Sequence, residues 1–179
     1  MGPIGRCGAN LSISPTRQSG LTLHVRPGMA YSQVMVAHRF QPYELLIADD
    51  DPGFRESVRM VFEPHASLVE ASCGEEAIEI VKTRAIDLVL LDIHMPRLSG
   101  IETLRVVKSL REALPCIVLS AGLTDQLRHE ASTALASDVL RKPVTRRQLI
   151  GAVCVALAAT YDDPEVERWI PPGTGPLRP

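Results

Sequence analysis

From residue 43 to residue 160, the chain alternates between two patterns of hydrophobic and polar positions. Short, nearly continuous apolar runs are typical of strands covered on both faces of a parallel sheet. They predict strands at 43–48, 67–72, 86–92, 115–121 and 138–142. Apolar residues at three- and four-residue spacing predict amphipathic helices at 52–63, 74–84, 100–113, 124–136 and 145–160. Such alternation favours right-handed crossovers and a parallel α/β sheet with helices on both faces.

The segments that flank this alternation follow neither pattern. Residues 1–42 contain four Arg and no Asp or Glu, and the lack of a period predicts a disordered or loosely ordered extension. An organelle transit peptide is an alternative, as is translation from a later start at Met29 or Met35. Residues 159–179 are acidic and then rich in Pro and Gly, which predicts either a linker or a short docking segment around Trp169.

Composition narrows the class of protein. A chain of 179 residues, 45% of them hydrophobic, suits one domain at 43–158 with tails and no output domain. The net charge of −2 does not favour direct nucleic-acid binding, which usually needs a basic patch. No apolar run reaches the roughly 20 residues of a membrane span, so a cytoplasmic protein is expected. The scattered cysteines suggest no zinc site or disulfide framework, and Cys116 and Cys154 are expected in the core.

Carboxylates gather where two of the predicted strands end. Asp49, Asp50 and Asp51 follow the first strand, and Asp92 ends the third. Ligands bind at the carboxyl ends of strands in an open α/β sheet, and carboxylates crowded there repel one another unless a cation lies among them. Oxygen ligands without a Cys or His cluster favour a hard ion, Mg²⁺ with Mn²⁺ as an alternative. Asp51, just before Pro52, is instead interpreted as a helix N-cap.

Two more strand ends carry polar side chains. Ser120 ends the fourth strand and can donate a hydroxyl hydrogen bond, and Lys142 ends the fifth and supplies a compact positive charge. Taken alone, Ser120 could cap the next helix and Lys142 could be a solvated charge. Their occurrence at successive strand ends favours one site that contains a carboxylate, a hydroxyl, an ammonium group and a metal ion.

Four motifs, "ADDD", "LLDIHMPRLSG", "VLSA" and "LRKP", stand in this order at the ends of four strands. On these motifs residues 43 to about 158 resemble the receiver domain of two-component response regulators, of the stand-alone, chemotaxis-regulator-like kind. The resemblance implies a flavodoxin-like (βα)5 fold, which is a doubly wound parallel sheet with strand order 2-1-3-4-5.

The same resemblance implies roles for the acidic residues. Asp92 would be the phosphoacceptor, and Asp49 and Asp50 would be the acidic pair that holds Mg²⁺. Asp92 and the backbone carbonyl of His94 would complete the protein ligands of the metal ion. The chain would catalyse its own aspartyl phosphorylation and slow dephosphorylation, rather than act as an ordinary enzyme on a small substrate.

The remaining roles follow from the same resemblance. Ser120 would be the switch hydroxyl, Lys142 would contact the phosphoryl group, and the Lys142–Pro143 bond would be cis. The phosphoryl donor would be a phosphohistidine on a sensor histidine kinase or a histidine phosphotransfer protein. The output would be contact with a further protein, whose identity the sequence does not indicate.

Val139 is one departure from the family pattern, because many receivers carry Tyr or Phe at this position. Two other classes of protein remain as alternatives. A receiver-like module could bind its partner without phosphorylation. A phosphatase of the haloacid dehalogenase type also uses an Asp and Mg²⁺, but the residue expected after its D-x-D is missing at Pro52-Gly53. The basic residues Arg141, Arg146 and Arg147 are interpreted as a solvated face or a partner surface.

Overall fold

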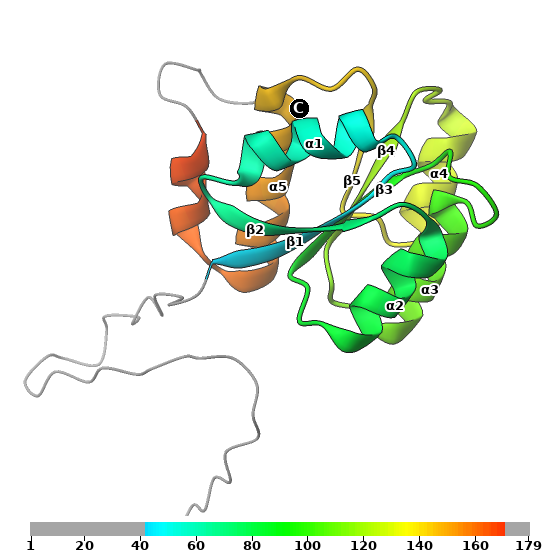
Figure 1. The fold of residues 1–179 in the computed structure, drawn as a ribbon, viewed down its shortest axis with the longest axis horizontal. Coiled ribbons are helices and arrows are strands. Elements are labelled where there is room, and N and C mark those ends of the chain that lie inside the picture. Colours follow the sequence, from blue (N-terminus) through cyan, green and yellow to red (C-terminus); the bar gives the residue numbers. More distant parts are fainter. Residues whose placement is uncertain (1–41, 171–179) are drawn as a thin grey trace, which may run out of the picture.

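The structure is a computed structural model that describes residues 42–170, and it confirms five strands that alternate with five helices (Figure 1). The strands are β1 (Tyr43–Ala48), β2 (Ala66–Ala71), β3 (Leu88–Asp92), β4 (Cys116–Ser120) and β5 (Asp138–Arg141). The helices are α1 (Pro52–Phe62), α2 (Gly74–Thr83), α3 (Gly100–Leu110), α4 (Asp125–Thr133) and α5 (Arg146–Tyr161). The predictions for residues 1–41, the later start sites included, lie outside the described residues.

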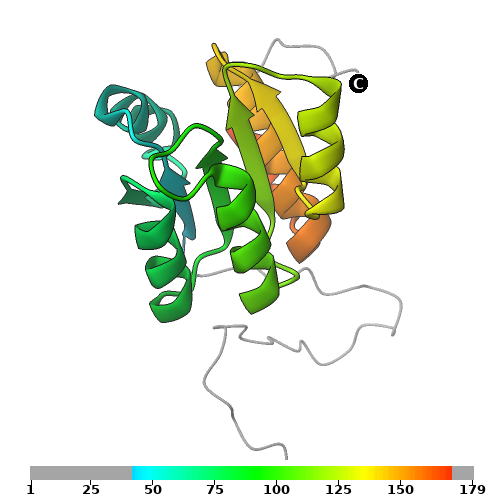
Figure 2. The ribbon, with the colours of Figure 1, turned by 90° about the vertical axis from the view of Figure 1, so that its right-hand side faces the viewer.

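All neighbouring strands pair in parallel in the order β2-β1-β3-β4-β5, as the family resemblance implies. Residues of β1 alternate between two hydrophobic cores because successive side chains point to opposite faces of a strand. Leu45 and Ile47 pack in the core under α1 and α5, whereas Leu46 and Ala48 pack in the core under α2, α3 and α4. Figure 2 shows these two helical layers from the side. Within residues 42–170, no helix is long and apolar enough to cross a membrane.

Four helices, α1, α3, α4 and α5, begin at the carboxyl edge of the sheet with polar side-chain caps, and the cap of α4 is Thr124. The Asp51 Oδ1 accepts hydrogen bonds from the backbone N–H of Gly53 at 2.8 Å and of Phe54 at 3.3 Å, which confirms the predicted N-cap. Reciprocal capping boxes open α3 and α5, from Ser99 with Glu102 and from Thr145 with Gln148. These bonds satisfy backbone donors that the first helical turn leaves unpaired. The caps therefore fix the residue at which each helix begins and each preceding loop ends.

The two cysteines assigned to the core are buried, as predicted. Cys116 lies in β4 and Cys154 in α5, and both are free thiols. Burial raises the pKa of each thiol to about 12. Because the thiolate is the reactive form, both side chains act as small packing residues.

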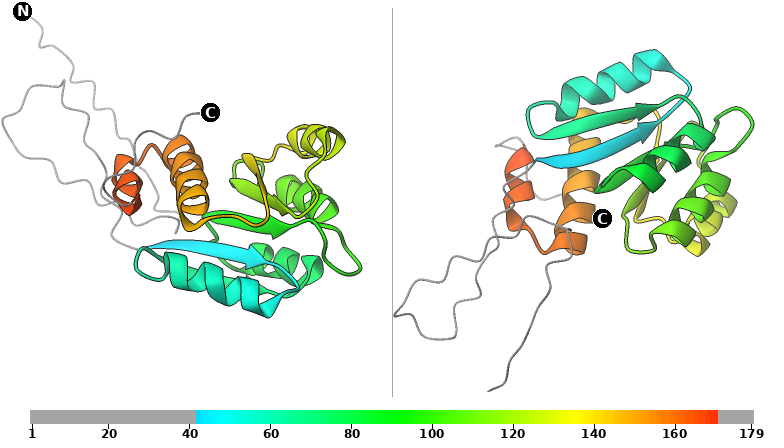
Figure 3. Two further views of the ribbon diagram at one scale, coloured as in Figure 1. Left: turned by 90° about the horizontal axis from the view of Figure 1, so that it is seen from above. Right: turned by 60° about the horizontal axis from the view of Figure 1, so that its bottom comes forward.

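The segment after α5 folds back against the domain. The helix continues to Tyr161, one residue past its predicted end, and the 3₁₀ helix η1 (Pro164–Trp169) follows. Figure 3 shows η1 beside α5 and the start of β1. The Trp169 ring stacks on His65 with centroids 5.4 Å apart and meets the Tyr43 ring at 5.8 Å. Of the two interpretations of this tail, the docking segment around Trp169 therefore describes residues 164–169.

We expect Trp169→Ala to lower the free energy of unfolding by about 2 kcal/mol, because it removes a partly buried ring that fills space at the amino end of β1. Urea denaturation followed by circular dichroism measures the change. Arg168→Ala is the matched control, since its exposed side chain pairs only with Glu165 in the described part of the chain, and it should stay within about 0.5 kcal/mol of the unmodified protein. Equal urea midpoints for the two variants would contradict the docking role of Trp169.

Candidate functional site

The acidic residues predicted to share one site lie together at the carboxyl edge of the sheet. β1 and β3 are neighbours, with Ala48 paired to Leu91, so the residues that follow them, Asp49 and Asp92, are adjacent. Carboxylate oxygens of Asp49, Asp50 and Asp92 lie within 4.8 Å of one another. Asp49 is 0% exposed and Asp92 is 3% exposed, while Asp50 faces solvent.

Lys142 places a positive charge between the two buried carboxylates. Its Nζ lies 2.6 Å from the Asp49 Oδ2 and 2.6 Å from the Asp92 Oδ1. It also lies 4.2 Å from the centre of the Phe54 ring, at a distance where a cation is attracted to an aromatic face. The Lys142–Pro143 bond is cis, as the resemblance implied. Lys142 is therefore held by Asp49 just after β1, by Phe54 in α1 and by Asp92 at the end of β3.

Burial and hydrogen bonding in this cluster shift the pKa values of Asp49 and Lys142. Burial raises the pKa of Asp49, and the hydrogen bond from Lys142 opposes this effect without cancelling it. Burial alone would lower the pKa of Lys142, but its hydrogen bonds to Asp49 and Asp92 outweigh burial, so the pKa of Lys142 lies above its ordinary value. The ammonium group therefore remains protonated at neutral pH.

Ser120 ends β4 and is completely buried. Its Oγ accepts a hydrogen bond from the backbone N–H of Gly122 at 3.2 Å. Its backbone carbonyl accepts from the N–H of Lys142 at 2.8 Å, which ties the ends of β4 and β5 together. Asp92 pairs with Leu119 in the sheet. Ser120 is the next residue of β4, so it lies at the same edge of the sheet as Asp92.

The loop after β3 wraps closely around Asp92. The backbone N–H of the exposed His94 donates to the Asp92 Oδ2 at 2.7 Å. A Cβ at Gly100 would lie 2.1 Å from the backbone oxygen of Asp92, so only glycine lets α3 begin this close to the strand end. The assignment of the His94 carbonyl as a metal ligand stays a prediction.

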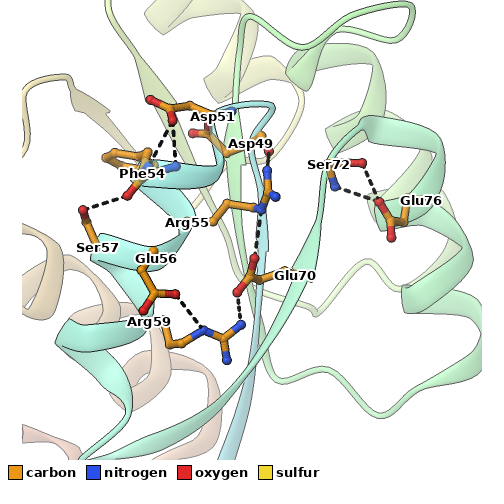
Figure 4. Close-up of polar contacts among 11 residues, drawn as sticks. Asp49, Asp51, Phe54, Arg55, Glu56, Ser57, Arg59, Glu70, Ser72 and Glu76 are labelled. Atoms are coloured by element: carbon orange, nitrogen blue, oxygen red, sulfur yellow. Dashed lines mark hydrogen bonds and ion pairs between the residues drawn. The ribbon is translucent and has the colours of Figure 1, made fainter.

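Two residues of this site were not anticipated from the sequence. Phe54 lies under Lys142, and Arg55 donates from Nη1 to the backbone oxygen of Asp49 at 2.7 Å. Figure 4 shows Arg55 between Asp49 and Glu70. An apolar residue and a basic residue in the first turns of a helix are common, and nothing in the local sequence indicates that they face an acidic cluster.

The donor set fits a hard divalent cation. Three carboxylate oxygens from Asp49, Asp50 and Asp92 lie close enough to share one ion, and oxygen-only ligands suit Mg²⁺ better than a softer metal. Two of these carboxylates are buried, where like charges repel strongly. A cation is thus the natural partner for the charge that Lys142 leaves uncompensated.

An acidic cluster with a bridging lysine, at the carboxyl edge of a sheet with order 2-1-3-4-5, is the arrangement of a receiver domain. Residues 45–154 match the family model of the response regulator receiver domain, and the chain belongs to this family. It is 35% identical over 123 residues to the response regulator MprA of Mycolicibacterium vanbaalenii, and 36% identical over 124 residues to that of Mycobacterium leprae. These matches cover 68% and 69% of this chain, which spans about half of the relatives' length, 53% and 54%.

Solved structures of receivers are similar to the described domain. The Francisella response regulator 1452 receiver domain is 29% identical with a TM-score of 0.62, and the match covers 67% of this chain and 99% of that one. A CheX–CheY–BeF3–Mg²⁺ complex from Borrelia burgdorferi contains a chain that is 28% identical with a TM-score of 0.62, over 64% of this chain and 89% of that one. Their agreement confirms the flavodoxin-like fold.

We expect Gly100→Ala to lower the free energy of unfolding by about 2 kcal/mol, because the added methyl group overlaps the backbone of Asp92. Urea denaturation gives the stability, and the amide NMR signals of residues 92–94 report the displacement of the site. Gly122→Ala is the control, since no atom lies within 4 Å of a Cβ there. An equal loss in both variants would show that the close approach at Gly100 is unimportant.

Proposed function

We propose that this chain is a response regulator receiver that accepts a phosphoryl group on Asp92 in the presence of Mg²⁺. One observation supports it most directly: the Lys142 ammonium group lies 2.6 Å from an oxygen of Asp92 and 2.6 Å from one of Asp49. The donor is a phosphohistidine of a sensor histidine kinase or a histidine phosphotransfer protein. Residues 45–154 belong to the receiver family, and the proposal adds the specific reaction that the domain carries out.

In this reaction an oxygen of Asp92 attacks the phosphorus of the donor phosphohistidine. The bond between phosphorus and the imidazole nitrogen breaks, its electron pair stays on that nitrogen, and an acyl phosphate forms on Asp92. Lys142 stabilises the negative charge on the phosphoryl oxygens. Asp49, Asp50, Asp92 and the His94 carbonyl would hold Mg²⁺, which would supply further positive charge beside the phosphoryl oxygens. Water later attacks the same phosphorus, the bond between phosphorus and the Asp92 oxygen breaks with its electron pair left on that oxygen, and inorganic phosphate leaves from the restored Asp92 carboxylate.

The output of the proposed switch begins at Ser120. Its hydroxyl, which accepts from Gly122 in the present structure, turns to donate to the new phosphoryl oxygens, since hydrogen bonds to charged groups are roughly twice as strong as neutral ones. The loop after β4 follows this movement. Contact with a further protein reads the change, in the cytoplasm and without direct binding to nucleic acid or a membrane.

A phosphodonor assay tests the reaction. We expect the full chain to gain the mass of one phosphoryl group from acetyl phosphate and Mg²⁺, and to gain none when Mg²⁺ is chelated. Asp92→Asn removes the nucleophile, and Asp50→Asn removes a charged ligand, so neither variant should be labelled. Asp51→Asn is the control, because Asn caps helices as well as Asp does and Asp51 binds the N–H groups of α1.

Mass spectrometry after a short incubation gives the labelled fraction of each variant. Undiminished labelling of Asp92→Asn would remove Asp92 as the acceptor, and undiminished labelling of Asp50→Asn would remove Asp50 from the metal site. A chain that takes no phosphoryl group under any of these conditions would instead be a receiver-like module that its partner recognises without phosphorylation.

Val139 bears on how completely the switch responds. It is half-buried in β5 against the core under α2, α3 and α4, and its small branched side chain can only partly fill the space that the loop after Ser120 vacates. We expect the activated state to be less favoured by about 1 kcal/mol, on the scale of a missing apolar group. Phosphorylation would then activate the domain partially, and partner binding would complete the change.

Amide NMR with and without beryllofluoride tests this partial response. Residues 120–125 should shift and remain broadened by exchange in the unmodified chain, and Val139→Tyr should sharpen them. A single sharp activated state without the substitution would contradict the role of Val139. Shifts confined to the immediate neighbours of Asp92 would contradict the movement itself.

A further inference from the structure

Arg55 connects the metal site to the edge of the sheet. Its side chain, 15% exposed, leaves α1 and makes two contacts through different nitrogens. Nη1 donates to the backbone oxygen of Asp49 at 2.7 Å, and Nε donates to the Glu70 Oε2 at 2.9 Å. Glu70 lies in β2, paired with Ile47 of β1. Figure 4 shows the guanidinium group held between the strand end and Glu70.

The carbonyl that Arg55 binds belongs to the peptide unit that leads into Asp50. A peptide unit is planar, so a fixed Asp49 oxygen also fixes the direction in which the chain enters Asp50. The N–H of Asp49 donates to the Ala71 oxygen at 3.1 Å, and the N–H of Asp51 donates to the Asp49 Oδ1 at 2.9 Å. These two hydrogen bonds hold the backbone on either side of the Asp49–Asp50 peptide. The hydrogen bond from Arg55 to the Asp49 oxygen holds this peptide itself.

Asp50 depends on this turn for its position. Its side chain is exposed, and among residues 42–170 no side chain or backbone N–H is hydrogen-bonded to its carboxylate. Yet its carboxylate lies within 4.8 Å of those of Asp49 and Asp92, against their mutual repulsion. Only the backbone of the turn can hold Asp50 there before a cation binds.

We infer that Arg55 is a positioning residue for the cation site: it clamps the Asp49–Asp50 peptide so that the Asp50 carboxylate is already in place for a divalent ion. This role rests on the proposed function. Groups that orient metal ligands typically contribute about 10- to 100-fold to metal affinity. Charge alone predicts the opposite sign, because loss of a nearby positive charge would strengthen cation binding. The Glu70 carboxylate, at 2.9 Å, already balances that charge.

Two substitutions at Arg55 separate geometry from charge. Arg55→Lys keeps the positive charge but replaces a rigid fork of donors with one flexible ammonium group, which cannot make both contacts in the same geometry. Arg55→Gln removes the charge as well. We expect both variants to bind Mg²⁺ about tenfold more weakly, whereas an effect of charge alone would leave the Lys variant unchanged and tighten binding by the Gln variant.

Arg59 offers a matched control within the same helix. It also pairs with Glu70 and lies 3.4 Å from Glu56, but within residues 42–170 it makes no hydrogen bond or ion pair with Asp49. Arg59→Gln therefore perturbs the same acidic partner without touching the clamped peptide. We expect its Mg²⁺ affinity to stay within about twofold of that of the unmodified chain.

The experiment is a Mg²⁺ titration of the full chain and the three variants, followed by the amide NMR signals of residues 49–51 and 92–94, with hydrogen exchange of the Asp51 amide measured without metal. We expect faster exchange at Asp51 and weaker Mg²⁺ binding in both Arg55 variants only. Normal affinity in Arg55→Lys, or equal losses in Arg59→Gln, would overturn the role of Arg55. Absence of Mg²⁺ binding by the unmodified chain would overturn the proposed function and this role with it.

Discussion

The contact of one ammonium group with two buried carboxylates is the interaction on which this domain is organised. Lys142 meets Asp49 and Asp92 at 2.6 Å each, and both acids have almost no exposed surface. Buried charges are costly unless they are paired and hydrogen-bonded. The charges can pair here because β1, β3 and β5 all end at the same edge of the sheet. Each buried charge therefore has a partner of opposite sign from another strand end. Stability of the fold and assembly of the site depend on the same three side chains.

The parallel sheet makes that meeting possible, and close packing makes it rigid. Apolar residues of β1, β3 and β4 alternate between two cores, so the register that buries them also fixes where each strand ends. Caps at Asp51, Ser99 and Thr145 then start the following helices. Gly100 lets α3 approach the Asp92 backbone. The polar groups are thus held by packing that is mostly apolar and lies outside the site itself.

The sequence predicted the order and type of every described strand and helix except η1, because alternating apolar runs and periodic segments are local signals. It also predicted the positions of Asp49, Asp92, Ser120 and Lys142 at strand ends, and the resemblance added the strand order. Arg55 was missed because its partner Glu70 lies 15 residues away and an arginine in a helix can meet many acids. The docking of Trp169 remained undecided because ring contacts with Tyr43 and His65 are tertiary.

Because the Tyr43 and Trp169 rings are in contact, the two ends of the described domain lie side by side, at the amino edge of the sheet and away from Asp92. Domains whose ends lie close together tolerate circular permutation, because their packing does not depend on where the chain is opened. A short bridge between the two ends, with an opening made in an exposed loop at the same edge, would give a circular permutant with the same sheet order. Neither change would touch the acidic edge. The order of the strands along the chain could therefore be altered without altering the chemistry of the site.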